Sequence, residues 1–407
     1  MSPVAATLTW LDLTSTDRNQ VRQILDLFEE QGTVDELGLG TVRDFFSDML
    51  FPGTSTLHTR LRYVLFIPWV YRRLEARHRQ VQDIDAEARE QEIRVIDALR
   101  SGGEEEGVIG GHARERLARL PSQAYWSALA RWGLFCPRQS QGWYHHHFHR
   151  LAGRRERTAD EPLEAEEPVR TWHPQLPEPP EDWLQATTFA LTGEEAAFLR
   201  DRIECAVPDS LLAYLAREGN AGLVDTQFLW EVPEVGQAPE HLQQLVAAAR
   251  RFSLHMEGAT LLYNLQLAEL RRDRHGDPQG VDQGHIDTYR ERLAVWAGQE
   301  AEETPFDPQA LWALAARHRV VLRQPLRRFV ESWSEVINSH GAAAVADSQR
   351  LRELIASRER ALKGPRARVV NTNRLDQWRG SAGLGRLDYR WPDVRRLLAD
   401  LHEGLGR

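Results

Sequence analysis

Four histidines lie within five positions of the chain, at 145, 146, 147 and 149. On a helix, His145 and His149 would share a face at the spacing of a zinc pair, whereas on a strand His145, His147 and His149 would align. No Cys-x-x-Cys or carboxylate motif accompanies them, and Cys136 lies nine residues before His145. The run is consistent with a zinc-dependent nuclease or hydrolase that recruits carboxylates from elsewhere in the fold, or with a solvated aromatic edge.

A basic C-terminal segment could contact phosphates. Residues 349–407 hold thirteen arginines and one lysine against seven acidic residues, a net charge of +7, so the preceding 348 residues carry −16 of the total of −9. The alternative to phosphate binding is that this segment docks on the acidic remainder of the same chain. The predicted phosphate donors are Arg358, Arg360, Lys363, Arg366, Arg368 and Arg374, with Trp378 as a stacking surface for bases.

Residues 122–135 resemble the second helix of a winged helix-turn-helix, in which aromatic residues pack inward and polar residues face a DNA groove. The exposed face would hold Gln123, Ser127 and Arg131, which is a small set for reading bases. Helix pairs with this pattern occur more often as plain hydrophobic cores. The pattern therefore leaves both DNA binding and simple packing open.

Only one of the 51 basic residues, Lys363, is a lysine. A Walker A loop, a Schiff-base enzyme, a protein kinase, a phospholipase D-type site and most PD-(D/E)xK nucleases each need a lysine in a defined context. Lys363 lies in ALKGP, which matches none of them, and the chain also lacks a dinucleotide-binding glycine fingerprint, a GxSxG elbow and an HExxH helix. We therefore expect no catalytic residue and no cofactor, with zinc as the metal that the histidine run would hold.

Three polar residues, His255, Glu257 and Asn264, lie on or beside a helix that is apolar on nearly every face at residues 261–270. Buried polar side chains need hydrogen-bond partners, and satisfied core groups outnumber catalytic ones. We expect these residues to be structural.

Apolar residues recur every three to four positions along most of the chain, which predicts amphipathic helices and a mainly α fold. Capping residues and glycine or proline breaks mark many of their ends, such as the capping box that begins at Thr192. Helices are expected around residues 21–28, 42–50, 55–77, 84–99, 112–120, 122–132, 193–203, 210–216, 240–270, 281–296, 308–316, 326–337, 348–362 and 392–401, with a short strand at 384–391.

The predicted organisation is two helical domains, 1–150 and 186–346, joined by an acidic Pro-rich linker at 151–185 and followed by a small basic mixed segment at 347–407. Residues 154–183 hold six prolines and nine acidic residues against four arginines, which buries too little apolar surface to fold alone. The longest strongly apolar stretch, residues 63–71, is too short to span a bilayer, no signal peptide is evident and only two cysteines are present. We expect a cytoplasmic protein with no membrane partner.

Several long, irregular strings resemble a bacterial family of unknown function across nearly the whole chain. They include WLDLTSTDRNQVRQILDLF, DELGLGTVRDFFSDMLFPGTST, LPSQAYWSALARWGLF and RERALKG. Genes of that family occur near helicases, DNA methyltransferases or phospholipase-like nucleases in phage-defence islands, so the resemblance implies a defence role by association. It carries over no catalytic residues.

These observations together predict a non-catalytic accessory subunit of an anti-phage defence system. Its basic C-terminal segment would bind DNA or a defence protein such as a helicase or nuclease, and its arginines would supply affinity and not sequence specificity. One alternative is the metal-dependent nuclease or hydrolase built on the histidine run. The other is a pure protein scaffold, in which the C-terminal arginines are paired internally and the largest exposed apolar patch lies elsewhere.

Overall fold

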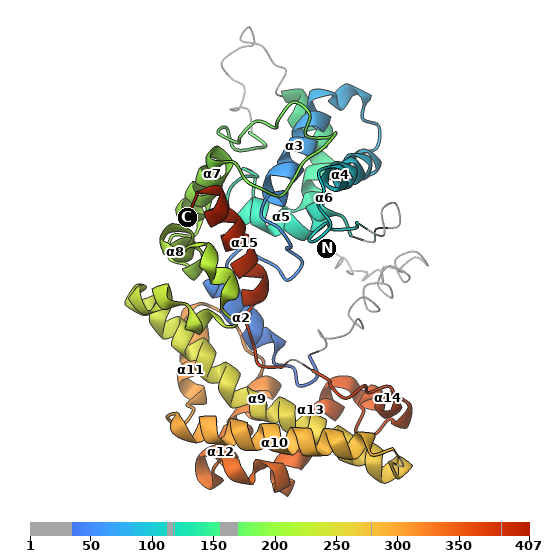
Figure 1. The fold of residues 1–407 in the computed structure, drawn as a ribbon, viewed down its shortest axis with the longest axis vertical. Helices are drawn as coiled ribbons and strands as arrows, with labels where there is room; N and C mark the ends of the chain where they lie inside the picture. The colour runs from blue at the N-terminus through green and yellow to red at the C-terminus, as the bar shows by residue number, and fades with distance from the viewer. Residues whose placement is uncertain (1–34, 112–116, 118, 155–169, 278, 384) are drawn as a thin grey trace, which may run out of the picture. The chain divides into compact units, whose positions relative to one another are not determined.

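The computed structural model describes residues 35–111, 117, 119–154, 170–277, 279–383 and 385–407, and most of them lie in helices (Figure 1). The predicted fold class, mainly α, is confirmed. Within these residues the only β pairing is an isolated antiparallel bridge between Phe135 and Trp172. The helix predicted around 21–28 and most of the one predicted at 112–120 lie outside the described residues. No helix in the described part combines the length and apolar composition needed to cross a bilayer.

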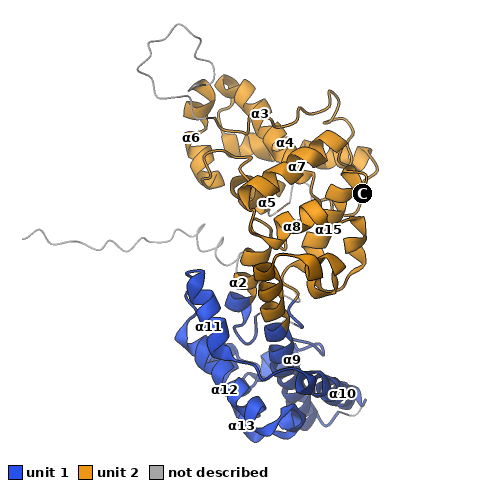
Figure 2. Cartoon of the chain, turned by 90° about the vertical axis from the view of Figure 1, so that its left-hand side faces the viewer, with its two compact units in different colours: residues 1–42, 251–387 blue, residues 43–250, 388–407 orange. Residues whose placement is uncertain are grey.

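The chain forms two compact units that are interleaved in sequence (Figure 2). Unit 1 contains residues 1–42 and 251–387, and unit 2 contains residues 43–250 and 388–407. These ranges do not coincide with the predicted boundaries at 150, 185 and 346. Two of the divisions fall inside the continuous helices α2 (Gly40–Leu50) and α9 (Glu240–His275), where helical periodicity gives no sign of a boundary.

Helix α3 (Tyr63–Ala76) is the central helix in the first half of unit 2, where it packs against α4 (Ile84–Ser101), α5 (Pro121–Arg131) and α6 (Gln141–Arg154). Its apolar residues are buried around the whole helix, as predicted for the stretch at 63–71. The helix begins at Tyr63 and not near residue 55, because the N–H groups of Thr59 and Arg60 donate to the Tyr125 hydroxyl at 2.7 and 3.0 Å. A short 3-10 helix, η1 (His78–Gln80), follows α3.

The described half of the predicted linker, residues 170–185, packs into unit 2 and is not a free linker. Trp172, Leu176 and Trp183 are buried, and Trp172 also forms the backbone bridge to Phe135. The Trp69 indole on α3 donates to the Pro177 carbonyl at 2.7 Å. The acidic and proline-rich composition obscured these apolar anchors, which are spaced too irregularly to be read as an element. Residues 155–169 lie outside the described residues.

The second half of unit 2 contains α7 (Gly193–Ala206), α8 (Leu211–Glu218), the 3-10 helices η3 (Ala221–Asp225), η4 (Leu229–Glu231) and η5 (Pro233–Gln237), and α15 (Trp391–Gly404). Helix α15 packs against α7, α8 and η3 (Figure 1). The capping box predicted for α7 is confirmed, because Thr192 Oγ1 accepts from the Glu195 N–H and Glu195 Oε2 accepts from the Thr192 N–H.

Unit 1 is built around the part of α9 that begins at Arg251. Residues 261–268 are all buried, as expected for a helix that is apolar on nearly every face there. The surrounding elements are α10 (Val281–Glu302), α11 (Pro308–Arg317), α12 (Gln324–His340), η6 (Ala342–Asp347), α13 (Gln349–Lys363), η7 (Gly364–Arg366) and α14 (Thr372–Asp376).

The predicted strand at 384–391 is wrong, because its described residues form turns and the start of a helix. Tyr389 and Arg390 have φ angles of 54° and 68°, and residues in this left-handed region cannot continue an extended strand. Arg390 is the residue before α15, which contains the helix predicted at 392–401.

Candidate functional site

The first predicted phosphate donor, Arg358 on α13, is used inside unit 1. Its side chain is 8% exposed, and its Nε donates to the Leu37 carbonyl at 2.9 Å. Its guanidinium lies 5.3 Å from the centre of the Phe329 ring, and burial lowers its pKa. Gly38 has a φ of 69° and leaves no room for a β-carbon beside this guanidinium. Arg358 therefore anchors residues 37–38 and is not available to phosphate.

Two further predicted donors, Lys363 and Arg368, share one buried carboxylate. Both pair with Glu36, which is 2% exposed, and Lys363 also lies 3.2 Å from Glu359 Oε1. Glu359 is fully buried and accepts from the Tyr263 hydroxyl at 2.6 Å and from the Arg368 N–H at 2.9 Å. Burial beside Glu359 raises the pKa of Tyr263. Two cations and two carboxylates thus form an internal charge cluster.

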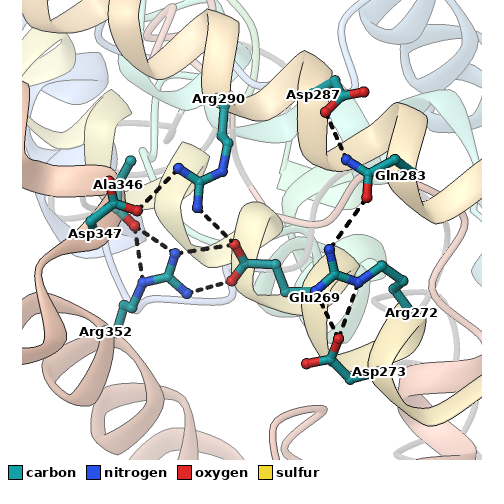
Figure 3. Close-up of polar contacts among 9 residues, drawn as sticks. All are labelled: Glu269, Arg272, Asp273, Gln283, Asp287, Arg290, Ala346, Asp347 and Arg352. Carbon is teal, nitrogen blue, oxygen red and sulfur yellow. Dashed lines mark hydrogen bonds and ion pairs between the residues drawn. The ribbon is translucent and has the colours of Figure 1, made fainter. Parts of the chain in front are cut away.

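Arg352, also on α13, belongs to a polar network that joins α9, α10, η6 and α13 in unit 1 (Figure 3). Glu269 on α9 accepts from Arg352 on α13 at 3.2 Å and from Arg290 on α10 at 3.3 Å. Arg290 also donates to Asp347 at 3.0 Å, and Arg352 donates to the Ala346 carbonyl at 2.9 Å. The positive charge of α13 is therefore largely neutralised within its own unit.

The predicted stacking residue, Trp378, is 2% exposed. The Arg271 guanidinium lies 4.8 Å from the centre of the Trp378 ring. The Trp378 indole Nε1 donates to Asn264 Oδ1 at 3.2 Å. No face of this ring is open to a nucleic-acid base. Arg374 is partly buried and donates to Gln377 Oε1 at 3.3 Å.

The exposed remainder of the segment surrounds the end of α13. Arg360 and Arg366 are exposed, and neither has a carboxylate partner within the residues that the structure describes. Leu362 lies between the two arginines in sequence and is 43% exposed, and Val370 follows Arg366 and is 53% exposed. We call Arg360, Leu362, Arg366 and Val370 the α13 tip. It combines positive charge with exposed aliphatic surface.

The predicted DNA-reading face of α5 is exposed as expected, but its side chains are partly engaged. Gln123 Oε1 accepts from the Leu120 N–H at 3.0 Å, which caps the helix, and Ser127 Oγ donates to the Gly53 carbonyl at 3.2 Å. Arg131 is exposed at the end of the helix. The described residues contain no β-hairpin that could serve as a wing.

The histidine run lies on α6, and the structure does not bring its members together. His145 Nδ1 is 2.7 Å from Asp85 Oδ1 and its Nε2 is 2.8 Å from the Tyr71 hydroxyl, so both ring nitrogens are engaged. His147 Nδ1 lies 2.8 Å from the Trp143 carbonyl of its own helix, and His149 is exposed. Across the described part of the chain, no three histidine, cysteine or carboxylate side chains are grouped so that they could hold a metal ion.

Sequence reasoning singled out His255 but missed its two partners. His255 Nδ1 lies 2.6 Å from Glu300 Oε1, and its Nε2 lies 2.8 Å from Ser334 Oγ, which is the order of groups in a hydrolase triad. All three residues are at most 5% exposed, and Ser334 Oγ also donates to the Val330 carbonyl at 2.7 Å. Burial lowers the pKa of His255. The group is a satisfied core network that a substrate cannot reach, and no sequence spacing connects its three helices.

The two other polar residues predicted on this helix also have internal partners. Asn264 donates to the Ala382 carbonyl at 2.8 Å and accepts from the Ala382 N–H at 2.7 Å, which fixes the loop before residue 383. Glu257 lies 3.8 Å from Arg386, and burial raises the pKa of its carboxyl.

Comparisons with known proteins identify one related family. The model of a family of unknown function, DUF6361, matches residues 5–404 of the chain. No curated protein and no solved structure matches it.

Proposed function

The chain belongs to the DUF6361 family of unknown function, and we propose that it is a non-catalytic accessory subunit that binds a protein partner through the α13 tip. The observation that carries this proposal is the exposure of Leu362 and Val370 beside two arginines that have no carboxylate partner in the described residues. Exposed aliphatic side chains gain free energy when a partner covers them, at roughly 25 cal/mol per Å². Flanking arginines favour a partner whose surface is acidic.

A non-catalytic role is supported by the residues around one cavity of unit 2. A cavity of about 490 Å³ in unit 2 contains no histidine, cysteine or serine among its described lining residues. Its buried carboxylate, Glu75, already accepts from the Tyr144 hydroxyl and the Trp172 indole. The cavity is lined by Trp69, Arg72, Arg73, Glu75, Ala76, Ala152, Glu178, Pro179 and Trp183.

A protein partner is favoured over nucleic acid by what the C-terminal segment leaves exposed. Three of the six predicted phosphate donors are held by internal partners, and the predicted stacking ring is buried. Leu362 and Val370 would gain little from a phosphate backbone, whereas apolar residues ringed by polar ones are typical of protein interfaces. The sequence resemblance to proteins encoded in phage-defence islands supports a defence component, such as a helicase or nuclease, as the partner.

The test compares two variants of the full chain in its own host. The tip variant is Arg360→Ala, Leu362→Ser, Arg366→Ala and Val370→Ser. The matched control changes two exposed arginines and two exposed valines elsewhere in unit 1: Arg317→Ala, Val295→Ser, Arg328→Ala and Val321→Ser. We expect the tip variant to lose both co-purification with the proteins encoded beside its gene and protection against phage, while the control keeps both. Equal behaviour of the two variants would contradict the proposal.

A second arm measures binding to random-sequence DNA as a function of salt. Each phosphate contact adds about 0.9 to the slope of log affinity against log salt concentration, so the loss of Arg360 and Arg366 would lower that slope by about 2 if they contact phosphates. We expect no such change. If the slope falls in the tip variant and not in the control, the α13 tip contacts phosphates, and the proposal of a protein partner is wrong.

A further inference from the structure

The only two cysteines of the chain, Cys136 and Cys205, line the same pocket of unit 2, although 68 positions separate them. Both are exposed, and neither is in a disulfide. The pocket has a volume of about 270 Å³, which is room for a small organic ligand. Its other lining residues are Trp132, Gly133, Arg138, His173, Arg202 and Ala206.

The backbone holds the walls of this pocket in place. The Cys136 N–H donates to the Thr171 carbonyl and the His173 N–H donates to the Leu134 carbonyl, each at 2.9 Å, on either side of the bridge between Phe135 and Trp172. Cys205 lies in the last turn of α7, three residues after Arg202. Cys136 therefore lies in a turn that two backbone hydrogen bonds hold to residues 171–173, and Cys205 lies in a helix.

The pocket is positively charged, although the chain as a whole is acidic. No carboxylate lines it, and neither Arg138 nor Arg202 has a carboxylate partner in the part of the chain that the structure describes. Arg202 lies 2.7 Å from His173 Nε2, and burial together with Arg202 lowers the pKa of that imidazole. Arg138 has a φ of 53°, a strained conformation for a residue with a side chain. Two guanidinium groups that pair with no described carboxylate, beside two thiols, suit an anionic, thiol-reactive ligand.

We propose that Cys136 and Cys205 form a reactive thiol pair that is modified preferentially by small disulfides bearing carboxylates, which Arg138 and Arg202 bind. One cysteine thiolate attacks a sulfur of the bound disulfide, whose S–S bond breaks, and the departing half leaves as a thiolate that takes a proton from water. The second cysteine thiolate then attacks the mixed disulfide and releases the other half. Overall the two cysteines lose two electrons to form an internal disulfide, and the small disulfide is reduced to two thiols.

The experiment compares two disulfides with arms of equal length, dithiodipropionate with two carboxylates and cystamine with two ammonium groups. The rate of thiol loss in the full chain is measured by intact mass at mildly alkaline pH, because burial raises the pKa of the Cys136 thiol although Arg170, Arg138 and Arg202 oppose that effect. We expect the dianion to react about tenfold faster than the dication, with a ratio that falls as salt is added.

The double variant Arg138→Gln, Arg202→Gln should abolish this preference, whereas Arg94→Gln, Arg150→Gln, the same charge change elsewhere in unit 2, should keep it. Thiol reactivity in urea should be equal for all forms, which shows that only the folded pocket differs. Equal rates for the two disulfides, or a preference that survives in the pocket variant, would overturn the proposal.

The thiol pair has its own readout. The wild-type chain should end as an internal disulfide, recognised by the loss of two hydrogens, whereas Cys205→Ser should stop at one attached thiol on Cys136. A wild-type chain that ends with two attached thiols would overturn the pairing. The α13 tip belongs to unit 1 and this pocket to unit 2, so the outcome here does not depend on the proposed partner.

Discussion

At the scale of single residues, the one lysine of the chain occupies a position where a compact cation suits the geometry. Lys363 reaches both Glu36 and Glu359, and its ammonium group can donate to two carboxylates from one atom. An arginine can also reach two carboxylates, as Arg290 does with Glu269 and Asp347, but it uses two different nitrogen atoms to do so. At Lys363 a single nitrogen atom therefore serves both carboxylates.

Replacing Lys363 by Met should destabilise unit 1. Glu359 would lose its ammonium partner while it stays buried, and Arg368 alone would neutralise Glu36. Because the Lys363 side chain is 18% exposed, the expected cost is about 1–3 kcal/mol, less than that of breaking a fully buried pair. Urea unfolding of the full chain measures it, with Arg366→Met as the exposed control. A Lys363 variant as stable as that control would contradict the internal charge cluster.

Glu92 should make unit 2 less stable as pH rises. Burial raises its pKa to about 7, although the Ser122 hydroxyl and N–H donate to the carboxyl at 2.7 and 2.8 Å. Between the ordinary pKa of 4.5 and about 7, the folded state keeps a proton that the unfolded state loses. Stability from this group is thus complete below the lower value and falls by up to about 1.4 kcal/mol per pH unit as pH rises through that window.

Glu92→Gln removes this titration, so the variant should gain stability relative to wild type as pH rises from about 5 to about 8. Urea midpoints at several pH values measure the difference. Glu90→Gln makes the same change on the exposed side of α4, where the carboxylate pairs with Arg94, and should show no such trend. Parallel curves for wild type and Glu92→Gln would refute a raised pKa at this site.

At the scale of elements, the sequence located a helix well where nearby residues cap its end. Thr192 and Glu195 satisfy each other's backbone N–H groups, and the helix predicted from them is present. The alternating apolar residues at 384–391 led to a wrong prediction of a strand. The left-handed conformation of Tyr389 and Arg390 cannot be recognised from the pattern of apolar residues. Residues 170–185 were misjudged for the opposite reason, since three buried apolar anchors are hidden in an acidic composition.

The cap of α7 is expected to contribute about 1 kcal/mol. Thr192→Ala leaves the Glu195 N–H without its side-chain acceptor and should lower the stability of unit 2 by that amount, whereas Thr192→Ser keeps the hydroxyl and should be close to neutral. Chemical unfolding of both variants measures the difference, and a loss shared equally by Ala and Ser would point away from capping.

At the scale of the whole molecule, the interleaving of the two units explains why the C-terminal segment was misread. Charge alone selected Arg358, Lys363 and Arg368, but the groups that neutralise them, Glu36 and the Leu37 carbonyl, lie more than 300 positions earlier in the chain. No local spacing encodes such pairs. Exposed residues with local surroundings, such as Arg131 on α5, were placed correctly by periodicity.

The division into units predicts that the last twenty residues are not a dispensable tail. Removing residues 388–407 deletes α15 and uncovers α7, α8 and η3. Hydrogen exchange should then accelerate throughout α7 and α8, while α10, α12 and α13 of unit 1 remain protected. Removing only residues 405–407 is the control; it deletes the bond from Arg407 to the Arg217 carbonyl at the end of α8 and should leave exchange in the rest of α7 and α8 unchanged. Continued protection of α7 and α8 without α15 would show that unit 2 is complete before residue 388.

The same interleaving sets an order for folding during synthesis. Residues 43–250 of unit 2 leave the ribosome before most of unit 1, but the helix that covers α7 and α8 emerges last, after all of residues 251–387. All residues of unit 1 have been made by residue 387, before unit 2 is complete at residue 407. The central helix of unit 1 is nevertheless made after most of unit 2. A nascent chain therefore carries an uncovered apolar surface on α7 and α8 while residues 251–387 are made, and a stalled ribosome would leave that surface to chaperones and proteases.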